Sequence, residues 1–411
     1  MNINNKNEQS VLLWNSSCSV HYFKGEVVSE FQKAENEKLV LKFSEKLKSA
    51  FRKNNDNLQV NKELNTQFKQ NIASLMANVF QFSENELAII NDNGFSSASK
   101  KFVAMARKFD SNITNEEIFQ ASRNLWIVNS LQVLLNKPVD VSDSLFAYSM
   151  LYPYTDNYID SPDIDESEKH AFSKRFRLRL KGVILDPANP HEEQVFKLVE
   201  LIESEWNRNE YPLVYESLLA IHDAQTRSIK LMSNCETPSK SELLDICIEK
   251  GGTSVLADGY LLNGTLTPEQ EEFCFNFGVL LQFVDDIQDL QEDIADKLET
   301  IFTCAAKEGE LSSYINRTIA FTHSVMNNAS LFDDEIHEHF KSLVLKSVKV
   351  LIAESVGLNS KSLECHYVEE VEKQSGLSFN FIQKYRNKMS GNRVSIMRKL
   401  TPLINREIGV A

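Results

Sequence analysis

The chain of 411 residues contains few of the residues that interrupt helices, with 13 glycines and 9 prolines. No stretch alternates apolar and polar residues strongly enough to predict a half-buried strand. Because glycine and proline are the poorest helix formers, this composition predicts an all-α fold. The apolar share of 42% and the charged share of 25% are typical of a globular protein.

Basic residues are in the minority, with 44 lysines and arginines against 58 aspartates and glutamates, a net charge of −14. No nucleic-acid partner is therefore expected, because such a partner usually requires a basic face. No stretch approaches the ~20 apolar residues that a membrane-spanning helix needs, so no integral membrane segment is expected either.

Cysteine is also scarce, and the 6 cysteines show no metal-ligand spacing. Several lie in apolar helical contexts, so they are interpreted as reduced core residues, which predicts a cytoplasmic protein. The apolar stretch near the N-terminus, Val11–Trp14, is too short for the core of a signal peptide.

The most informative stretch is an apolar helical segment that carries a row of carboxylates. Thr267, Pro268 and Gln270 are typical of a helix start, and the pattern predicts a helix over residues 268–293. Polar side chains recur at spacings of three and four on one face, at Gln282, Asp285, Asp286, Asp289 and Asp293. Such neighbours repel one another, and a buried carboxylate needs a partner. A hard cation such as Mg²⁺ is a suitable partner, and the alternative is a solvated acidic helix face.

The segment Gly-Val-Leu-Leu-Gln-Phe-Val-Asp-Asp-Ile-Gln-Asp over residues 278–289 resembles the second aspartate-rich motif of the class I isoprenoid synthases. These all-helical enzymes include prenyltransferases and terpene cyclases. Upstream, Asp156 and Asp160 follow an apolar helix in a position that resembles the first motif of the same family. Their Asp-x-x-x-Asp form differs from that of farnesyl diphosphate synthase-like enzymes and is more similar to that of squalene and phytoene synthases or an unusual terpene synthase.

The resemblance covers roughly residues 100–300 and implies a single large helical bundle of the isoprenoid synthase type with a central active-site pocket. We expect an irregular N-terminal arm over residues 1–25 and one helical domain over 26–411. The resemblance also implies a cluster of two or three Mg²⁺ ions. Their ligands, which are also the catalytic residues, would be Asp156, Asp160, Asp285, Asp286 and Asp289.

Several basic or hydroxyl side chains are candidates for binding the diphosphate, namely Arg175, Arg179, Arg227, Lys250, Thr253 and Lys297. The short turn at 265–266 predicts that the helix before it runs antiparallel to the acidic helix, which places Lys250 opposite roughly residue 281, about 6 Å from Asp285 along the axis. Lys250 and Thr253 resemble the Lys-Thr pair of prenyltransferases, and Lys297 resembles their lysine after the second motif. The segment with Arg175 and Arg179 equally fits a basic surface helix, and Arg227 fits a salt bridge to Asp223.

The expected function is Mg²⁺-dependent ionisation of an allylic prenyl diphosphate by a terpene synthase-like enzyme (a cyclase). The first alternative is a prenyltransferase, either chain-elongating or squalene/phytoene synthase-like. A chain-elongating or head-to-head enzyme needs a second diphosphate site, with Lys100, Lys101, Arg107 and Lys108 as candidates.

Two alternatives come from other classes. A more remote one is a His-Asp metal phosphohydrolase built on His222 and Asp223, with His170 and His191 upstream. The other is a helical interaction protein whose acidic stripes are solvated. The expected partner is the prenyl diphosphate substrate, and a homodimer is left open.

Overall fold

The computed structural model of the chain describes residues 1–17, 23, 25–52, 74–161, 163–228, 238–327 and 335–390, without the side chains of residues 46–52, 160 and 388–390. This part of the chain forms 17 α-helices and one 3-10 helix, and no β-strand. The predicted all-α fold is therefore confirmed. None of the described helices combines the length and the apolar character that crossing a bilayer requires.

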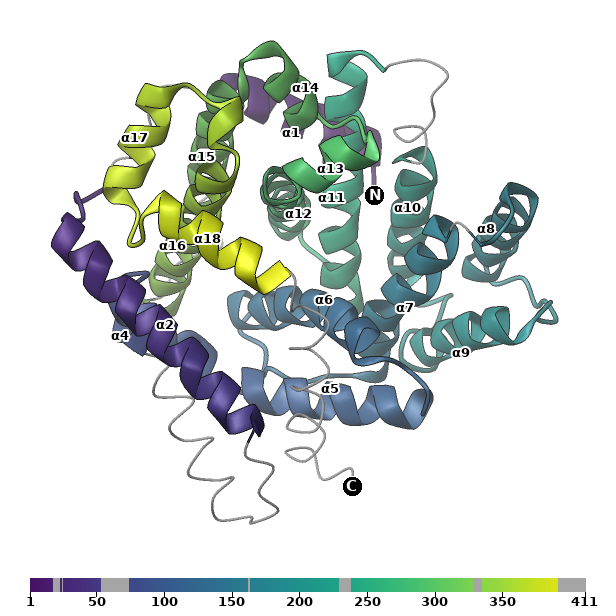
Figure 1. Ribbon diagram of the computed structural model, residues 1–411. Coiled ribbons are helices and arrows are strands. Elements are labelled where there is room, and N and C mark those ends of the chain that lie inside the picture. The colour runs from purple at the N-terminus through teal and green to yellow at the C-terminus, as the bar shows by residue number, and fades with distance from the viewer. Residues whose placement is uncertain are drawn as a thin grey trace.

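The first eight helices are α1 (Ile3–Ser16), α2 (Glu30–Arg52), α4 (Glu84–Asp92), α5 (Phe95–Phe109), α6 (Asn115–Leu134), α7 (Asp143–Asp160), α8 (Glu166–Leu180) and α9 (Pro190–Glu205). The others are α10 (Pro212–Ser228), α11 (Lys240–Asn263), α12 (Pro268–Gln288), α13 (Leu290–Asp296), α14 (Ile301–Glu308), α15 (Leu311–Met326), α16 (Glu335–Leu358), η3 (Ser360–Ser362), α17 (Cys365–Gln374) and α18 (Phe379–Ser390). Figure 1 shows α11 and α12 near the middle, α7 to α10 on one side of them, and α15 and α16 on the other.

Helix starts follow local capping signals. The Thr267 side chain accepts a hydrogen bond from Gln270 N, the Gln270 side chain accepts one from Thr267 N, and Pro268 lies in the first turn of α12. The same reciprocal box starts α6 at Thr114 and Glu117. These bonds satisfy backbone N–H groups that no helical carbonyl can reach, which is why the predicted starts are observed.

Glycines allow α11 and α12 to pack against each other as the predicted antiparallel pair. A Cβ atom added at Gly251 would lie 2.6 Å from Gln282 Cβ and 2.7 Å from Gly278 O. No side chain fits at that distance, so Gly251 serves close backbone contact between the two helices. The pairing places the neighbouring Lys250 beside residues 278–282 of α12, as expected from the short turn.

The acidic helix differs from the prediction at its C-terminal end. The expected helix over 268–293 bends at Asp289, which ends α12 with φ −89° and ψ 5°, and α13 begins one residue later. Backbone hydrogen bonds continue across the bend, from Asp289 N to Asp285 O and from Asp293 N to Asp289 O. The acidic row is therefore continuous in hydrogen bonding although it is divided between two helices.

The N-terminal arm is the main correction. Residues 3–16, expected to be irregular, form α1, because its polar face finds specific partners on α12. Lys6 Nζ lies 2.6 Å from Glu271 Oε2, and Ser10 Oγ donates to Asn276 Oδ1 at 2.6 Å. On its apolar face, Trp14 is 1% exposed and packs 4.5 Å from the Phe283 ring, measured between centroids.

One continuous hydrophobic core includes residues from Trp14 to Phe379. Four cysteines lie in the described part of the chain, at 247, 274, 304 and 365, and all are free thiols. The other two, Cys18 and Cys235, lie outside the described residues.

Candidate active site

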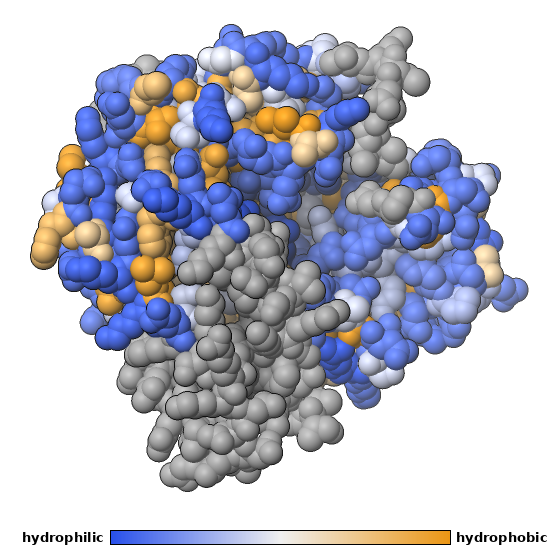
Figure 2. All heavy atoms as spheres, in the orientation of Figure 1, coloured by the Kyte–Doolittle hydropathy of each residue, from blue (hydrophilic) through white to orange (hydrophobic). Residues whose placement is uncertain are grey.

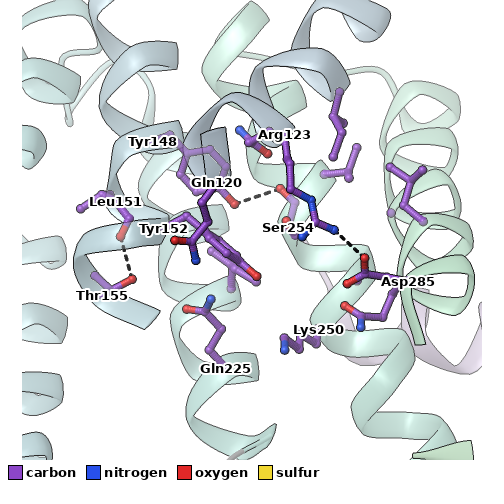
Figure 3. A pocket seen from close by; sticks show the side chains of 18 of the residues that line it. Gln120, Arg123, Tyr148, Leu151, Tyr152, Thr155, Gln225, Lys250, Ser254 and Asp285 are labelled. Atoms are coloured by element: carbon purple, nitrogen blue, oxygen red, sulfur yellow. Dashed lines mark hydrogen bonds and ion pairs between the residues drawn. The ribbon is translucent and has the colours of Figure 1, made fainter. Parts of the chain in front are cut away.

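A cavity of about 300 Å³ is lined by residues of seven helices: α6, α7, α8, α10, α11, α12 and α16. Most of its wall is apolar, with Ile127, Leu151, Val255, Leu281 and Leu351 among the lining residues. The side chains of Gln225, Lys250 and Asp285 lie toward one end, which we call the charged end, whereas Tyr148 lies at the opposite end (Figure 3). A pocket with an apolar wall and a few converging polar groups is the usual form of a small-molecule site.

The acidic cluster consists of Asp285, Asp286, Asp289 and Asp293. Burial raises the pKa of the Asp286 carboxyl to about 6. Burial, together with the charges of the other carboxylates in the cluster, raises the pKa of Asp293 to about 7. Burial and the charge of Asp285 likewise raise the pKa of Asp289. Burial and the neighbouring carboxylates therefore disfavour the ionised form of these side chains, and a bound cation would favour it.

Lys250 lies between the two acidic helices. Burial by itself would lower the pKa of its ammonium group, but nearby acidic groups, among them Asp156 of α7 and Asp286 of α12, outweigh burial and raise it. No carboxylate in the described part of the chain lies within ion-pairing distance of its Nζ. The ammonium group thus keeps its charge without a direct partner, at the charged end of the pocket.

The first acidic site is only partly described. Gln225 Nε2 of α10 donates to both carboxylate oxygens of Asp156, at 3.0 and 3.3 Å. Thr155 Oγ1 also donates to Asp156 Oδ1, at 3.2 Å. The side chain of Asp160 lies outside the described residues. Gln225 therefore orients Asp156 beside the charged end, a role that sequence spacing did not suggest.

An arginine that the sequence did not single out joins the acidic cluster. Arg123 of α6 donates through Nη2 to Asp285 Oδ1 at 2.5 Å, and the two side chains are 59% and 40% exposed (Figure 3). Burial acts to lower the pKa of Arg123, but the charge of Asp285 and the hydrogen bond to it raise the pKa on balance. The guanidinium is the closest counter-ion that the described structure gives to the acidic cluster.

Asp286 is held differently, by neutral groups. Gln282 Nε2 donates to its Oδ1 at 2.7 Å, and the Cys247 thiol donates to its Oδ2 at 3.1 Å. At 8% exposure, Asp286 is buried, and both of its carboxylate oxygens are hydrogen-bonded.

The two arginines predicted on α8 are bound to glutamates of α9. Arg175 pairs with Glu192 at 2.8 and 2.9 Å, and Arg179 pairs with Glu203 at 2.7 and 2.5 Å. Neither arginine lines the pocket, although Phe176 between them does. We call these two pairs the α8–α9 ladder.

The remaining candidates are dispersed. Arg227, a candidate for diphosphate binding, pairs with Glu249 of α11 and not with Asp223, the partner in the alternative interpretation. The Thr253 hydroxyl donates to Glu249 O of its own helix at 2.6 Å and is fully buried. Lys297 is exposed and ends α13 in the left-handed conformation, with φ 58°. Of the six candidates for diphosphate binding, the described structure brings only Lys250 to the pocket wall.

The histidines of the phosphohydrolase alternative do not come together. His222 lines the pocket 3.5 Å from Ser173 Oγ, and Asp223 is paired with Arg177 at 2.7 Å. His191 stacks on Tyr158 with ring centroids 4.3 Å apart, and His170 is exposed. Burial lowers the pKa of His222 to about 4, so this imidazole is neutral at pH 7.

The basic residues of a second diphosphate site are also engaged elsewhere. Lys101 Nζ lies 2.8 Å from both Asp140 oxygens, and Arg107 donates to Ile113 O and Asn115 Oδ1. Neither residue lines the pocket.

The carboxylates at and beside the charged end, Asp285 and Asp156, suit Mg²⁺ in chemical type. Within the described side chains, no group of three or more histidine, cysteine, aspartate or glutamate residues is arranged to hold a metal ion. The fit is therefore to an ion that takes one or two carboxylates, of which Asp285 lines the pocket, and fills its shell with water or phosphate oxygens. Comparisons of the chain with protein-family models, with curated proteins and with solved structures find no significant match.

Proposed function

We propose that this chain is a Mg²⁺-dependent enzyme of the class I isoprenoid synthase type that ionises an allylic prenyl diphosphate, with a terpene synthase-like outcome. The observation that carries the proposal is the position of Lys250 near Asp156 and Asp286, at the charged end of a pocket whose wall is mostly apolar. A prenyl diphosphate has an apolar chain and a charged diphosphate at one end, so its two parts match the apolar wall and the charged end.

Each group at the charged end has a distinct role in the proposal. Mg²⁺, when bound, supplies positive charge that stabilises the leaving diphosphate. Lys250 and Arg123 donate hydrogen bonds to diphosphate oxygens, because both are cations on the pocket wall. Asp285 and Asp156 would hold the ion, and Gln225 fixes the orientation of Asp156.

In the proposal, the apolar wall of the pocket excludes water while the carbon–oxygen bond breaks and the allylic cation rearranges. The aromatic ring of Tyr148 faces this space with its hydroxyl bound to Ser254 O at 3.0 Å, so the ring orientation is fixed. A fixed ring face can stabilise a passing cation.

The test is turnover of allylic diphosphates of several chain lengths with Mg²⁺, with and without isopentenyl diphosphate, followed by pyrophosphate release and extracted products. Asp285→Asn and Asp156→Asn keep the shape of each side chain and are expected to lower turnover by about 100-fold. The matched control is Asp296→Asn, an exposed aspartate at the end of α13.

The outcomes separate the candidate functions. Products from an allylic diphosphate alone, lost in both variants, support the terpene synthase-like proposal. Products that require isopentenyl diphosphate would change it to a prenyltransferase. No turnover, together with no effect of Mg²⁺ on the melting temperature, would show that the acidic cluster is only a polar helix face.

A further inference from the structure

A buried polar group stands at the end of the pocket opposite the charged end. Asn124 of α6 lines the pocket there, and its Nδ2 donates to Ser149 Oγ at 3.1 Å and to Asp258 Oδ1 at 2.9 Å. Both N–H bonds of the amide are used in this way. Its Oδ1 is neither bonded to a described residue nor enclosed by protein, so it faces the pocket.

Asp258 of α11 completes this group from behind. The residue is 0% exposed, and its Oδ2 has no hydrogen-bond partner among the described residues. Burial raises the pKa of its carboxyl well above the usual value. A buried polar atom without a partner costs about 1–3 kcal/mol, and folded proteins commonly satisfy such atoms with an ordered water or a ligand.

The helices fix how far this group lies from the charged end. Asp258 follows Lys250 by two turns of α11, about 12 Å, and Ser149 precedes Asp156 by about 10 Å on α7. Most of the residues that line the wall are apolar, although Tyr152 and Ser254 also line it. A ligand that spans the pocket would therefore meet polar atoms at both ends and a mostly apolar wall between them.

We propose that Asn124, Ser149 and Asp258 form a distal subsite that binds one O–H group, supplied either by a hydroxyl at the far end of an elongated ligand or by a bound water. Asn124 Oδ1 accepts the hydrogen bond, and the other two side chains hold the amide in place. Neither hydrogen-bond partner of the amide is a cation, so the subsite does not suit a second phosphate. The distal subsite rests on the proposed function in one respect only, namely that the ligand group at the charged end is a diphosphate.

The test uses two bisphosphonates with one chain length, one ending in a hydroxyl and the other in a methyl group, in a series bracketing about 12 Å. Neither has an allylic carbon–oxygen bond, so binding is measured without reaction, by titration calorimetry with Mg²⁺. The measured quantity is the Kd of the methyl compound divided by that of the hydroxyl compound. Asn124→Leu is expected to lower this ratio by about 3- to 10-fold, the value of one hydrogen bond.

The ratio in the unchanged protein identifies the source of the O–H group. A ratio well above one means that the ligand hydroxyl occupies the subsite. A ratio near one that falls below one in Asn124→Leu means that a water occupies it and the leucine replaces that water. An unchanged ratio in the variant would overturn the subsite.

Two further variants keep the test decisive if Asn124→Leu folds poorly. Ser149→Ala removes one anchor of the amide and should lower the ratio in the same direction by a smaller factor. Gln120→Leu is the matched control, because Gln120 lies one turn away on α6, lines the same pocket and is bonded to Asn157 at 3.0 Å. The control should leave the ratio unchanged.

A second ligand pair separates this proposal from the proposed function. A long-chain alkanol and its methyl ether carry no phosphonate, so their affinity ratio reports on the distal subsite alone. If Asn124→Leu changes that ratio while the bisphosphonates bind no better than the alkanol, the subsite stands and the diphosphate site fails.

Discussion

Arginine or lysine side chains lie near carboxylates in two regions of the molecule, and the two regions differ in how completely these charges are paired. In the α8–α9 ladder each guanidinium meets its glutamate through two hydrogen bonds, and Glu192 is 2% exposed. Glu203 is also bonded by Arg208, at 2.8 Å. At the charged end of the pocket, Arg123 makes one bond to a half-exposed aspartate and Lys250 makes no direct ion pair within the described structure.

The difference separates charges that stabilise the fold from charges that remain available. Breaking a bidentate pair leaves a buried carboxylate without its partner, which costs several kcal/mol of stability. Such a pair is therefore poorly suited to exchange with a ligand. A partly buried ammonium without a partner gains a hydrogen bond when an anion arrives. The surface over α8 and α9 is largely hydrophilic in Figure 2, in keeping with a structural role for that ladder.

The largest expected effect comes from the unpartnered charge. Lys250→Met should lower turnover of an allylic diphosphate by about 100-fold, since one electrostatic contact to the leaving group is lost. The melting temperature should change little, because no ion pair in the described structure is broken. Steady-state kinetics and thermal unfolding measure the two effects, with Lys197→Met, a surface pair with Glu193, as control. Equal turnover in both variants would remove Lys250 from the site.

The ladder should respond in the opposite way. Arg175→Met leaves the Glu192 carboxylate buried without its main partner and should lower the free energy of unfolding by about 2–3 kcal/mol. Arg177→Met is the matched control on the same helix, because its partner Asp223 is 47% exposed, and it should cost about 1 kcal/mol or less. Urea denaturation measures both, and similar losses would show that burial of the partner does not set the cost.

The pH dependence of stability should differ in sign between the two regions. Asp286 has a folded-state pKa of about 6, above its unfolded value, so the folded state binds more protons between about pH 4 and 6. Its contribution to stability is therefore lost as pH rises through that window, by on the order of 2 kcal/mol. Asp286→Asn does not titrate and should gain stability relative to the unchanged chain over the same range, in unfolding experiments without divalent cations.

Glu203 supplies the contrast. Burial acts to raise its pKa, but hydrogen bonds from Arg179 and Arg208 outweigh burial and lower it. Its stabilising contribution is present above the unfolded pKa and is lost as pH falls, so Glu203→Gln should come closest to the unchanged chain at low pH. Differences of the same sign in both variants would contradict the comparison.

Local signals suffice for part of this architecture. The capping box at Thr267 and the short turn before it determine the α11–α12 pairing, and that pairing determines where Lys250 lies. Each step uses residues close in sequence, and this is why the position could be predicted. The bend at Asp289 and the helix α1 were missed, because α1 depends on contacts such as Lys6 with Glu271 that lie far apart in the chain.

Long-range partners account for what could not be predicted at the site. Arg123 and Asp285 are 162 residues apart, and Gln225 and Asp156 are 69 apart, so no spacing rule connects them. The arginines of α8 could be recognised as cations, but not as cations whose glutamate partners lie on α9. Whether a charge is available depends on which acids the fold brings to it.

The smallest expected effect comes from Arg123. Its guanidinium is paired with Asp285, as in the ladder, yet it lies on the pocket wall, where it is available to a ligand. Arg123→Met removes the counter-ion of Asp285 and should tighten binding of Mg²⁺ alone by a few-fold, within about 1 kcal/mol, because exposed pairs are weak. The same variant should weaken binding of Mg²⁺–pyrophosphate, because a donor to the anion is lost. Calorimetry with each ligand measures the two shifts, and Arg123→Lys, which keeps the charge, should retain most of both affinities. Opposite shifts would mean that the guanidinium exchanges Asp285 for the anion. Tighter binding of both ligands would contradict this exchange and would mean that Arg123 only hinders ligand binding.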